Sequence, residues 1–254
     1  MSIETAQVRR TVAYHMDDRK TAVIVSAHSA DFVWRAGGAI SLYAQRGWKI
    51  TVVCLSFGER GESAKLWGSP GMTLHEVKKQ RKEEALQAAH ILGAHVHFYD
   101  VGDYPMRISD DILFKLAGLF RELRPEFILT HSTSDPYNFD HPLACRVTQE
   151  ARIIAQAHGH EPQTPVISAP SVFLFEPHQP EQCNWKPQIL LDITPVWEKK
   201  YAAFQVMSAQ EHLWNYYERV ALQRGAQGAR NSGRKMKYGE AYQRIFPEVT
   251  DMLQ

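Results

Sequence analysis

No stretch of this chain is apolar over the roughly 20 residues that a membrane-spanning helix requires. An excess of one charge is also lacking, because 29 Lys and Arg residues nearly balance 28 Asp and Glu residues and leave a formal net charge of +1. So small a net charge produces no field that would attract nucleic acid or an anionic membrane over long range. The composition therefore argues against both kinds of partner.

Cysteine is scarce, and the three cysteines, Cys54, Cys145 and Cys183, are far apart in the chain. None has a second cysteine at the spacing of a metal-binding knuckle, and an odd, scattered set suits a reducing compartment better than a disulfide framework. The first twenty residues mix both charges and contain no apolar stretch long enough for a signal peptide. We therefore expect a cytoplasmic protein.

The chain has 254 residues, of which 44% are hydrophobic, so it can bury a large core without metal or disulfide staples. We find no internal repeat, heptad array, low-complexity tract or linker that would separate domains. These features predict an N-terminal extension over residues 1–20 and one domain over residues 21–254.

Short apolar runs alternate with segments of helical periodicity through most of the chain. Runs such as TAVIVSA, which starts at Thr21, are typical of strands buried on both faces of a parallel sheet. We expect strands at 21–27, 49–55, 95–99, 127–130, 171–177 and 189–194, and helices at 31–46, 73–92, 109–124, 141–158, 196–207 and 210–224. This β-α-β-α alternation predicts a doubly wound, Rossmann-like α/β fold, with a mostly parallel sheet and helices on both faces.

Three local features bear on this prediction. Thr73 followed by Glu76 is a capping-box pattern that would begin a helix. Residues 56–72 carry four glycines and no period, which is typical of a long functional loop. The turn after the first strand lacks the G-x-G-x-x-G pattern of dinucleotide binding, which argues against a nucleotide-binding module.

Polar residues follow two of the strands at the edge where a parallel sheet binds its ligands. The first strand ends in AHSAD, which places His28 and Asp31 on one turn, and the fourth leads through THSTSDPYNFDH to His141. Two imidazoles and a carboxylate with a coordination position left open are typical of catalytic zinc. Alternatively, such histidines simply satisfy backbone groups.

Three motifs of this chain resemble motifs of the PIG-L (LmbE-like) family of zinc-dependent N-deacetylases. AHSADF corresponds to the family's AHPDDE, NFDH to its HPDH, and RKEEALQAAHILG to its RxxEAxxAxxxLG helix. The motifs span residues 21–145, and the C-terminal YGEAYQRIF is a weaker similarity to the family's tail. The resemblance implies an LmbE-like fold and a Zn²⁺ ion bound by His28, Asp31 and His141.

Two departures from the family pattern bear on the reaction. The aspartate that serves as general base in the deacetylases corresponds to Ala30, which cannot accept a proton. The first histidine of HPDH corresponds to Asn138, which can donate a hydrogen bond to a substrate but cannot carry a proton near neutral pH. The sequence thus keeps the implied metal ligands without the hydrolytic base.

The first turn, AHSADFVWRAGGAI, resembles that of a hydratase branch of the family. The resemblance implies a metal-dependent hydro-lyase that adds water to the double bond of an unsaturated oxo-tricarboxylate in the degradation of gallate and other aromatic acids. The substrate would then be a small polycarboxylate. A zinc-dependent N-deacetylase with another base, and a metal-free interaction protein, are the alternatives.

A hydratase needs a base for water and an acid for the neighbouring carbon. We expect Glu62, in the glycine-rich loop, to be the base, with Glu59 as its competitor. We expect His178 to be the acid, because imidazole titrates near neutrality; Glu176 is a weaker candidate. Glu62 and His178 could instead be solvated surface groups.

A polycarboxylate substrate also requires cationic and polar contacts. Arg60 is the first candidate, because a guanidinium binds a carboxylate through two hydrogen bonds, and Asn138 is a second substrate contact. The weaker candidates are Arg35 and Arg107, the possible aromatic walls are Trp67, Tyr104 and Tyr137, and the possible hydrogen-bond partners of His141 or His131 are Asp135 and Asp140. The stretch HLWNYYERVAL could form the interface of a homo-oligomer or pack on its own sheet.

Overall fold

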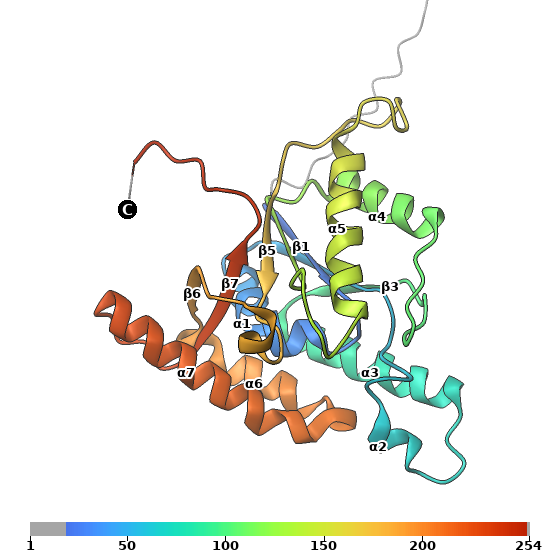
Figure 1. The fold of residues 1–254 in the computed structure, drawn as a ribbon, viewed down its shortest axis with the longest axis vertical. Helices are drawn as coiled ribbons and strands as arrows, with labels where there is room; N and C mark the ends of the chain where they lie inside the picture. Colours follow the sequence, from blue (N-terminus) through green and yellow to red (C-terminus); the bar gives the residue numbers. More distant parts are fainter. Residues whose placement is uncertain (1–18, 253–254) are drawn as a thin grey trace, which may run out of the picture.

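The structure, a computed structural model, describes residues 19–252. Residues 1–18, most of the predicted N-terminal extension, lie outside the described residues. The described chain forms one α/β domain around a seven-stranded sheet (Figure 1). The strands are β1 (Thr21–Ser26), β2 (Lys49–Cys54), β3 (His95–Phe98), β4 (Phe127–Thr130), β5 (Ser171–Phe175), β6 (Ile189–Asp192) and β7 (Gly239–Arg244).

The strand order is β3-β2-β1-β4-β5-β7-β6, and the five strands from β3 to β5 are parallel. Side chains of β1 alternate between two cores, with Ile24 in one and Val25 in the other, because successive residues of a strand face opposite sides. The predicted doubly wound, mostly parallel sheet is therefore confirmed.

Helices cover both faces of the sheet (Figure 1). One core lies between the sheet and α1 (Asp31–Gln45), α3 (Leu74–Leu92), α6 (Trp197–Gln205) and α7 (Trp214–Ser232). The other lies beneath α4 (Asp110–Leu123) and α5 (Asp140–Gln156). Among residues 19–252, none of the helices combines the length and the apolar character needed to cross a membrane.

The start of α3 follows the sequence signals closely, whereas the predicted bounds 210–224 of the last helix are wrong. Ser208–Leu213 form a 3-10 helix, and α7 continues to Ser232, where Gly233 in a left-handed conformation ends it. The Thr73 hydroxyl accepts the Glu76 N–H, and the Glu76 carboxylate accepts the Thr73 N–H, so the predicted capping box is confirmed at the start of α3. Gly93 ends that helix with φ of 88°, a left-handed conformation that glycine adopts without strain. The predicted loop 56–72 differs in containing a short helix, α2 (Ala64–Trp67).

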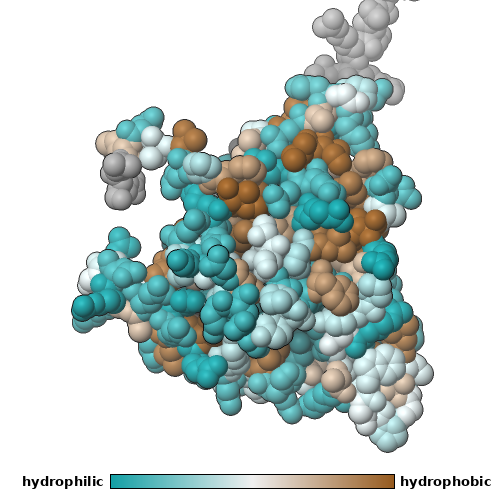
Figure 2. Space-filling view, in the orientation of Figure 1, coloured by the Kyte–Doolittle hydropathy of each residue, from teal (hydrophilic) through white to brown (hydrophobic). Residues whose placement is uncertain are grey.

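The surface is mixed in character. On the face drawn in Figure 2, hydrophobic side chains gather around α5, whereas α7 is mostly hydrophilic. Two large apolar side chains near the ends of α5 are exposed: Phe139 just before its start and Ile153 near its C-terminal end.

The C-terminal segment YGEAYQRIF contains a strand that the sequence pattern did not predict. β7 inserts between β5 and β6 and is antiparallel to both. Its Gly, Glu, Gln and Arg residues break the alternation that marks a strand. The strand forms because Ala241 and Tyr242 are buried and because its polar residue Glu240 binds groups inside the fold.

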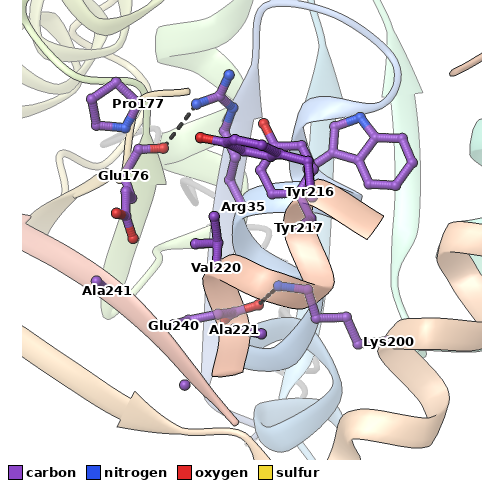
Figure 3. Close-up of a pocket in the computed structure, with 12 residues that line it drawn as sticks. Arg35, Glu176, Pro177, Lys200, Tyr216, Tyr217, Val220, Ala221, Glu240 and Ala241 are labelled. Carbon is purple, nitrogen blue, oxygen red and sulfur yellow. Dashed lines mark hydrogen bonds and ion pairs between the residues drawn. The ribbon is translucent and has the colours of Figure 1, made fainter. Parts of the chain in front are cut away.

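Glu240 is a buried carboxylate with four hydrogen bonds. It accepts the N–H groups of Gly38 (2.6 Å) and Ala39 (2.8 Å) in α1, the Lys200 ammonium (2.5 Å) of α6 and the Tyr242 hydroxyl (2.7 Å). Figure 3 shows the Lys200–Glu240 pair beneath the side chain of Arg35. One carboxylate thus joins β7, α6 and the helix that carries the candidate site.

The substitution Lys200→Met tests this joint. It leaves the Glu240 charge buried without its cation, and we expect the free energy of unfolding to fall by about 3–5 kcal/mol. Urea denaturation measures the change. The matched control is Lys199→Met at the exposed neighbouring position, which should shift stability by less than about 0.5 kcal/mol. Equal effects of the two substitutions would contradict the account.

Candidate metal and catalytic site

The predicted metal ligands converge at the carboxyl ends of β1 and β4. His28 lies on the turn after β1, Asp31 begins α1, and His141 lies in the first turn of α5. One ligand atom each from His28, Asp31, His141 and Glu62 lies within 4.8 Å of the others. The tertiary structure thus brings Glu62, predicted as a base, to the same point.

Two buried nitrogen atoms in this group, His28 Nδ1 and His141 Nε2, face nearby carboxylates but have no hydrogen-bond partner among the described residues. His28 Nδ1 lies 3.1 Å from Glu62 Oε1 and 3.3 Å from Asp31 Oδ2, and His141 Nε2 lies 3.5 Å from Asp31 Oδ1. Unpaired polar atoms are costly in a protein interior. Imidazole nitrogens and carboxylate oxygens are ligands that divalent transition metals accept, so the group fits such an ion.

The other nitrogen of each imidazole contacts a carboxylate. His141 Nδ1 lies 2.8 Å from Asp135 Oδ2, and His28 Nε2 lies 3.3 Å from Asp140 Oδ2. Such contacts orient metal-binding histidines. The expectation for Asp135 agrees with this arrangement, but Asp140 contacts His28 rather than His141 or His131, because it lies at the start of α5 beneath the turn after β1.

The pKa values show how strongly this group attracts a cation. Burial lowers the pKa of His28, but the carboxylates of Glu62, Asp140 and Asp31 outweigh burial and raise it well above its ordinary value. Burial raises the pKa of Asp31, but His141 and His131 lower it well below its ordinary value. A positive charge, whether protons or a metal ion, is thus stabilised at this point.

His131 has a supporting position rather than a place among the ligands. Its Nε2 accepts the N–H of Ala27 (2.9 Å), and its ring stacks on His141 with centroids 4.1 Å apart. Burial and the neighbouring His141 lower the pKa of His131 to about 3. The neutral ring therefore holds the turn after β1 against His141.

Two carboxylates compete for the role of base, and they face different ways. Glu62 Oε1 accepts a hydrogen bond from Asn138 Nδ2 (3.2 Å). Burial raises the pKa of Glu62, but His28 outweighs burial and lowers the pKa below its ordinary value, so the group is ionised. Glu59 Oε2 accepts the Phe57 N–H, while its Oε1 lies 3.5 Å from Lys78 Nζ. The geometry favours Glu62. Ala30, at the position of the deacetylase base, is buried at the start of α1.

A cavity of about 140 Å³ opens beside the ligand group. Of the residues predicted for chemistry or substrate contact, Glu62, His178, Asn138 and Tyr137 line it. His178 is fixed there by its ring stacking on Tyr216, with centroids 4.2 Å apart, and by a hydrogen bond from the Tyr216 hydroxyl to its carbonyl. Residues from distant parts of the chain therefore share one cavity.

The remaining candidates for substrate contact differ in whether they line this cavity. The Arg60 side chain is half exposed, its Nη1 lies 3.6 Å from Glu59 Oε1, and it does not line this cavity, so the substrate contact of Arg60 stays a prediction. Arg35, a weaker candidate, is buried and lines the cavity. Also absent from the described lining are Arg107, Trp67 and Tyr104, while the carboxylate of Glu176 binds Arg224.

Four lining residues were not predicted: Trp34, Gln210, Leu213 and Tyr217. Three of them belong to residues 210–217, within or beside the stretch HLWNYYERVAL. Tyr217 stacks on Trp34 with centroids 5.4 Å apart, so part of this stretch packs on its own domain. The aromatic residues of this stretch made it noticeable in the sequence, but no sequence pattern predicted that it would line the cavity.

Comparison with known proteins gives a consistent result. The PIG-L family, described as GlcNAc-PI de-N-acetylase, matches residues 23–152. A 4-oxalmesaconate hydratase of Pseudomonas putida is 61% identical over 239 residues, covering 92% of this chain and 93% of the relative. A 1D-myo-inositol 2-acetamido-2-deoxy-alpha-D-glucopyranoside deacetylase of Thermobifida fusca is 28% identical, covering 77% of this chain and 84% of the relative.

Solved structures agree. The crystal structure of GalB, the 4-carboxy-2-hydroxymuconate hydratase from Pseudomonas putida, is 61% identical with a TM-score of 0.91, covering 92% of this chain and all of that one. The N,N'-diacetylchitobiose deacetylase from Pyrococcus horikoshii shares the fold, with 21% identity and a TM-score of 0.75 over 90% of this chain and 84% of that one. As its three motifs predicted, the chain belongs to the PIG-L family.

Proposed function

We propose that the chain is a metal-dependent hydratase, a hydro-lyase that adds water to 4-oxalmesaconate and forms 4-carboxy-4-hydroxy-2-oxoadipate in gallate degradation. The observation that carries the proposal is a metal-binding group that retains its ligands while the deacetylase base position is Ala30. Similarity at 61% identity to a hydratase over most of the chain supports it.

The proposed metal is zinc, held by His28, Asp31 and His141, with Glu62 beside them. When bound, a divalent ion would polarise the oxo and carboxylate oxygens of the substrate. The sequence further supports a cytoplasmic location and a homo-oligomeric state as parts of the proposal.

Glu62 is proposed to take a proton from the attacking water. It is ionised, it lines the cavity, and the hydrogen bond from Asn138 Nδ2 to its Oε1 holds the carboxylate in place. The water oxygen then bonds to one carbon of the double bond. His178 is proposed to deliver a proton to the other carbon, and solvent exchanges both protons afterwards, so that the net change is the addition of one water.

An assay with the two substrate classes tests the reaction. Hydration of 4-oxalmesaconate removes its conjugated double bond, so we expect the ultraviolet absorbance to fall on addition of the metal-loaded protein. The protein should release no acetate from N-acetylated amino sugars. Acetate release without loss of absorbance would overturn the hydratase proposal and favour the deacetylase alternative.

The substitution Glu62→Gln separates the base from the metal ligands. We expect kcat to fall by roughly 10²- to 10⁴-fold, which is the usual contribution of a general base, while the metal content stays near that of the unaltered protein. His141→Ala should lose metal as well as activity, measured by elemental analysis. Glu59→Gln is the control and should keep kcat within about threefold. Full activity of Glu62→Gln would rule out the proposed base.

The pH dependence tests His178. Burial and nearby Arg35 lower the pKa of His178 below its ordinary value of about 6.5. An acid must be protonated to act, so kcat/KM should decrease as pH rises through this lowered pKa, and His178→Gln should lack that limb. If the limb that His178→Gln removes were instead one in which kcat/KM rises with pH, His178 would be a base.

A further inference from the structure

Arg35 brings a buried positive charge to the cavity wall. Its Nη1 donates to the Glu176 carbonyl (2.8 Å), the contact that Figure 3 shows. Its Nε is buried without a hydrogen-bond partner and lies 3.5 Å from Asp31 Oδ1. The guanidinium is thus anchored at one corner while another N–H group has no acceptor.

This charge is permanent. A guanidinium does not lose its proton in proteins, and that of Arg35 is buried. A permanent cation in a buried wall requires an anion. Asp31 lies nearby, but it is also among the proposed metal ligands, so its charge would be shared with the metal. A substrate carboxylate beside Arg35 would supply that anion.

Gln210 presents a hydrogen-bond donor to the same cavity. Its Oε1 accepts from Arg81 Nη2 (2.8 Å), and a guanidinium can only donate, so the orientation of the amide is fixed. Arg81 is itself fully buried and is held by Glu84 (2.9 Å) and the Phe57 carbonyl (3.2 Å). Among the described residues no hydrogen bond engages Gln210 Nε2, although Gln210 lines the cavity.

We propose that Arg35 and Gln210 form a carboxylate-binding subsite beside the metal-binding group, and that this subsite selects polycarboxylate substrates over neutral amides. The inference rests on the proposed function for the identity of the substrate class. Arg35 supplies charge and Gln210 supplies a donor in a fixed direction. Neither group would find a charged counterpart on a neutral N-acetyl sugar.

Binding of an unreactive probe, propane-1,2,3-tricarboxylate, to the metal-loaded protein tests the subsite by calorimetry. The substitution Gln210→Glu keeps an acceptor for Arg81 but replaces the donor with a negative charge. We expect the Kd of the probe to rise roughly 10- to 100-fold, with unchanged metal content. The matched control, Gln87→Glu at an exposed position of α3, makes the same charge change and should leave Kd within twofold.

The substitution Arg35→Lys keeps the charge but removes the paired donors, and Kd should rise roughly 10-fold. Arg146→Lys, at an exposed position on α5, is its control. The neutral triamide of the probe should bind weakly and equally to all variants. In the hydration assay, the same two substitutions should raise KM more than they lower kcat.

Kd values within twofold of the unaltered protein for both Gln210→Glu and Arg35→Lys would overturn the subsite. So would equal losses of affinity for the probe and its triamide, because a structural defect, and not carboxylate recognition, would then explain them. Binding needs no turnover, so the two proposals can fail separately. Variant-sensitive binding without hydration would support the subsite and overturn the hydratase.

Discussion

The constraint on which the rest of this structure depends is the burial of two imidazoles and two carboxylates around one point. His28 Nδ1 and His141 Nε2 have no hydrogen-bond partner there, and Asp31 and Glu62 face them. Positive charge, from protons or from a metal ion, stabilises such a group, because like charges and unpaired polar atoms are costly in an interior. The parallel sheet provides the convergence, since the turns after its strands meet at one edge.

Around this point the structure separates three tasks. The hydrogen bonds of Asp135 and Asp140 orient the imidazoles. Glu62 and His178, which we propose for proton transfer, line the cavity, and Arg35 brings positive charge to its wall. The resemblance to the deacetylases places Ala30 at the position of their base, while other loops carry titratable groups beside the cavity. A change of reaction in this fold therefore needs no change in the sheet, because chemistry depends on loop residues and the fold depends on the core.

The positioning of α1 links the site to the C-terminal strand. Glu240 of β7 binds two N–H groups of α1 and the Lys200 ammonium, and it accepts the Tyr242 hydroxyl (2.7 Å), which also lies 3.3 Å from the Arg35 carbonyl. Asp31 and Arg35 belong to the first turns of that helix. The hydrogen bonds of Glu240, which is far from α1 in sequence, thus position the helix that carries both a proposed metal ligand and a proposed substrate contact.

The sequence by itself determined the parallel sheet, the capped start of α3 and the convergence of His28, Asp31 and His141, because hydrophobic period, capping residues and strand-end position are local properties. Only the tertiary structure decided that β7 completes the sheet, that Glu62 rather than Glu59 faces the metal-binding group, and that Arg35 and Gln210, rather than Arg60, line the cavity. These outcomes depend on long-range packing. The direction of a side chain on a loop is set by neighbours such as Lys78 and Arg81, and the spacing of residues along the chain carries no record of those neighbours.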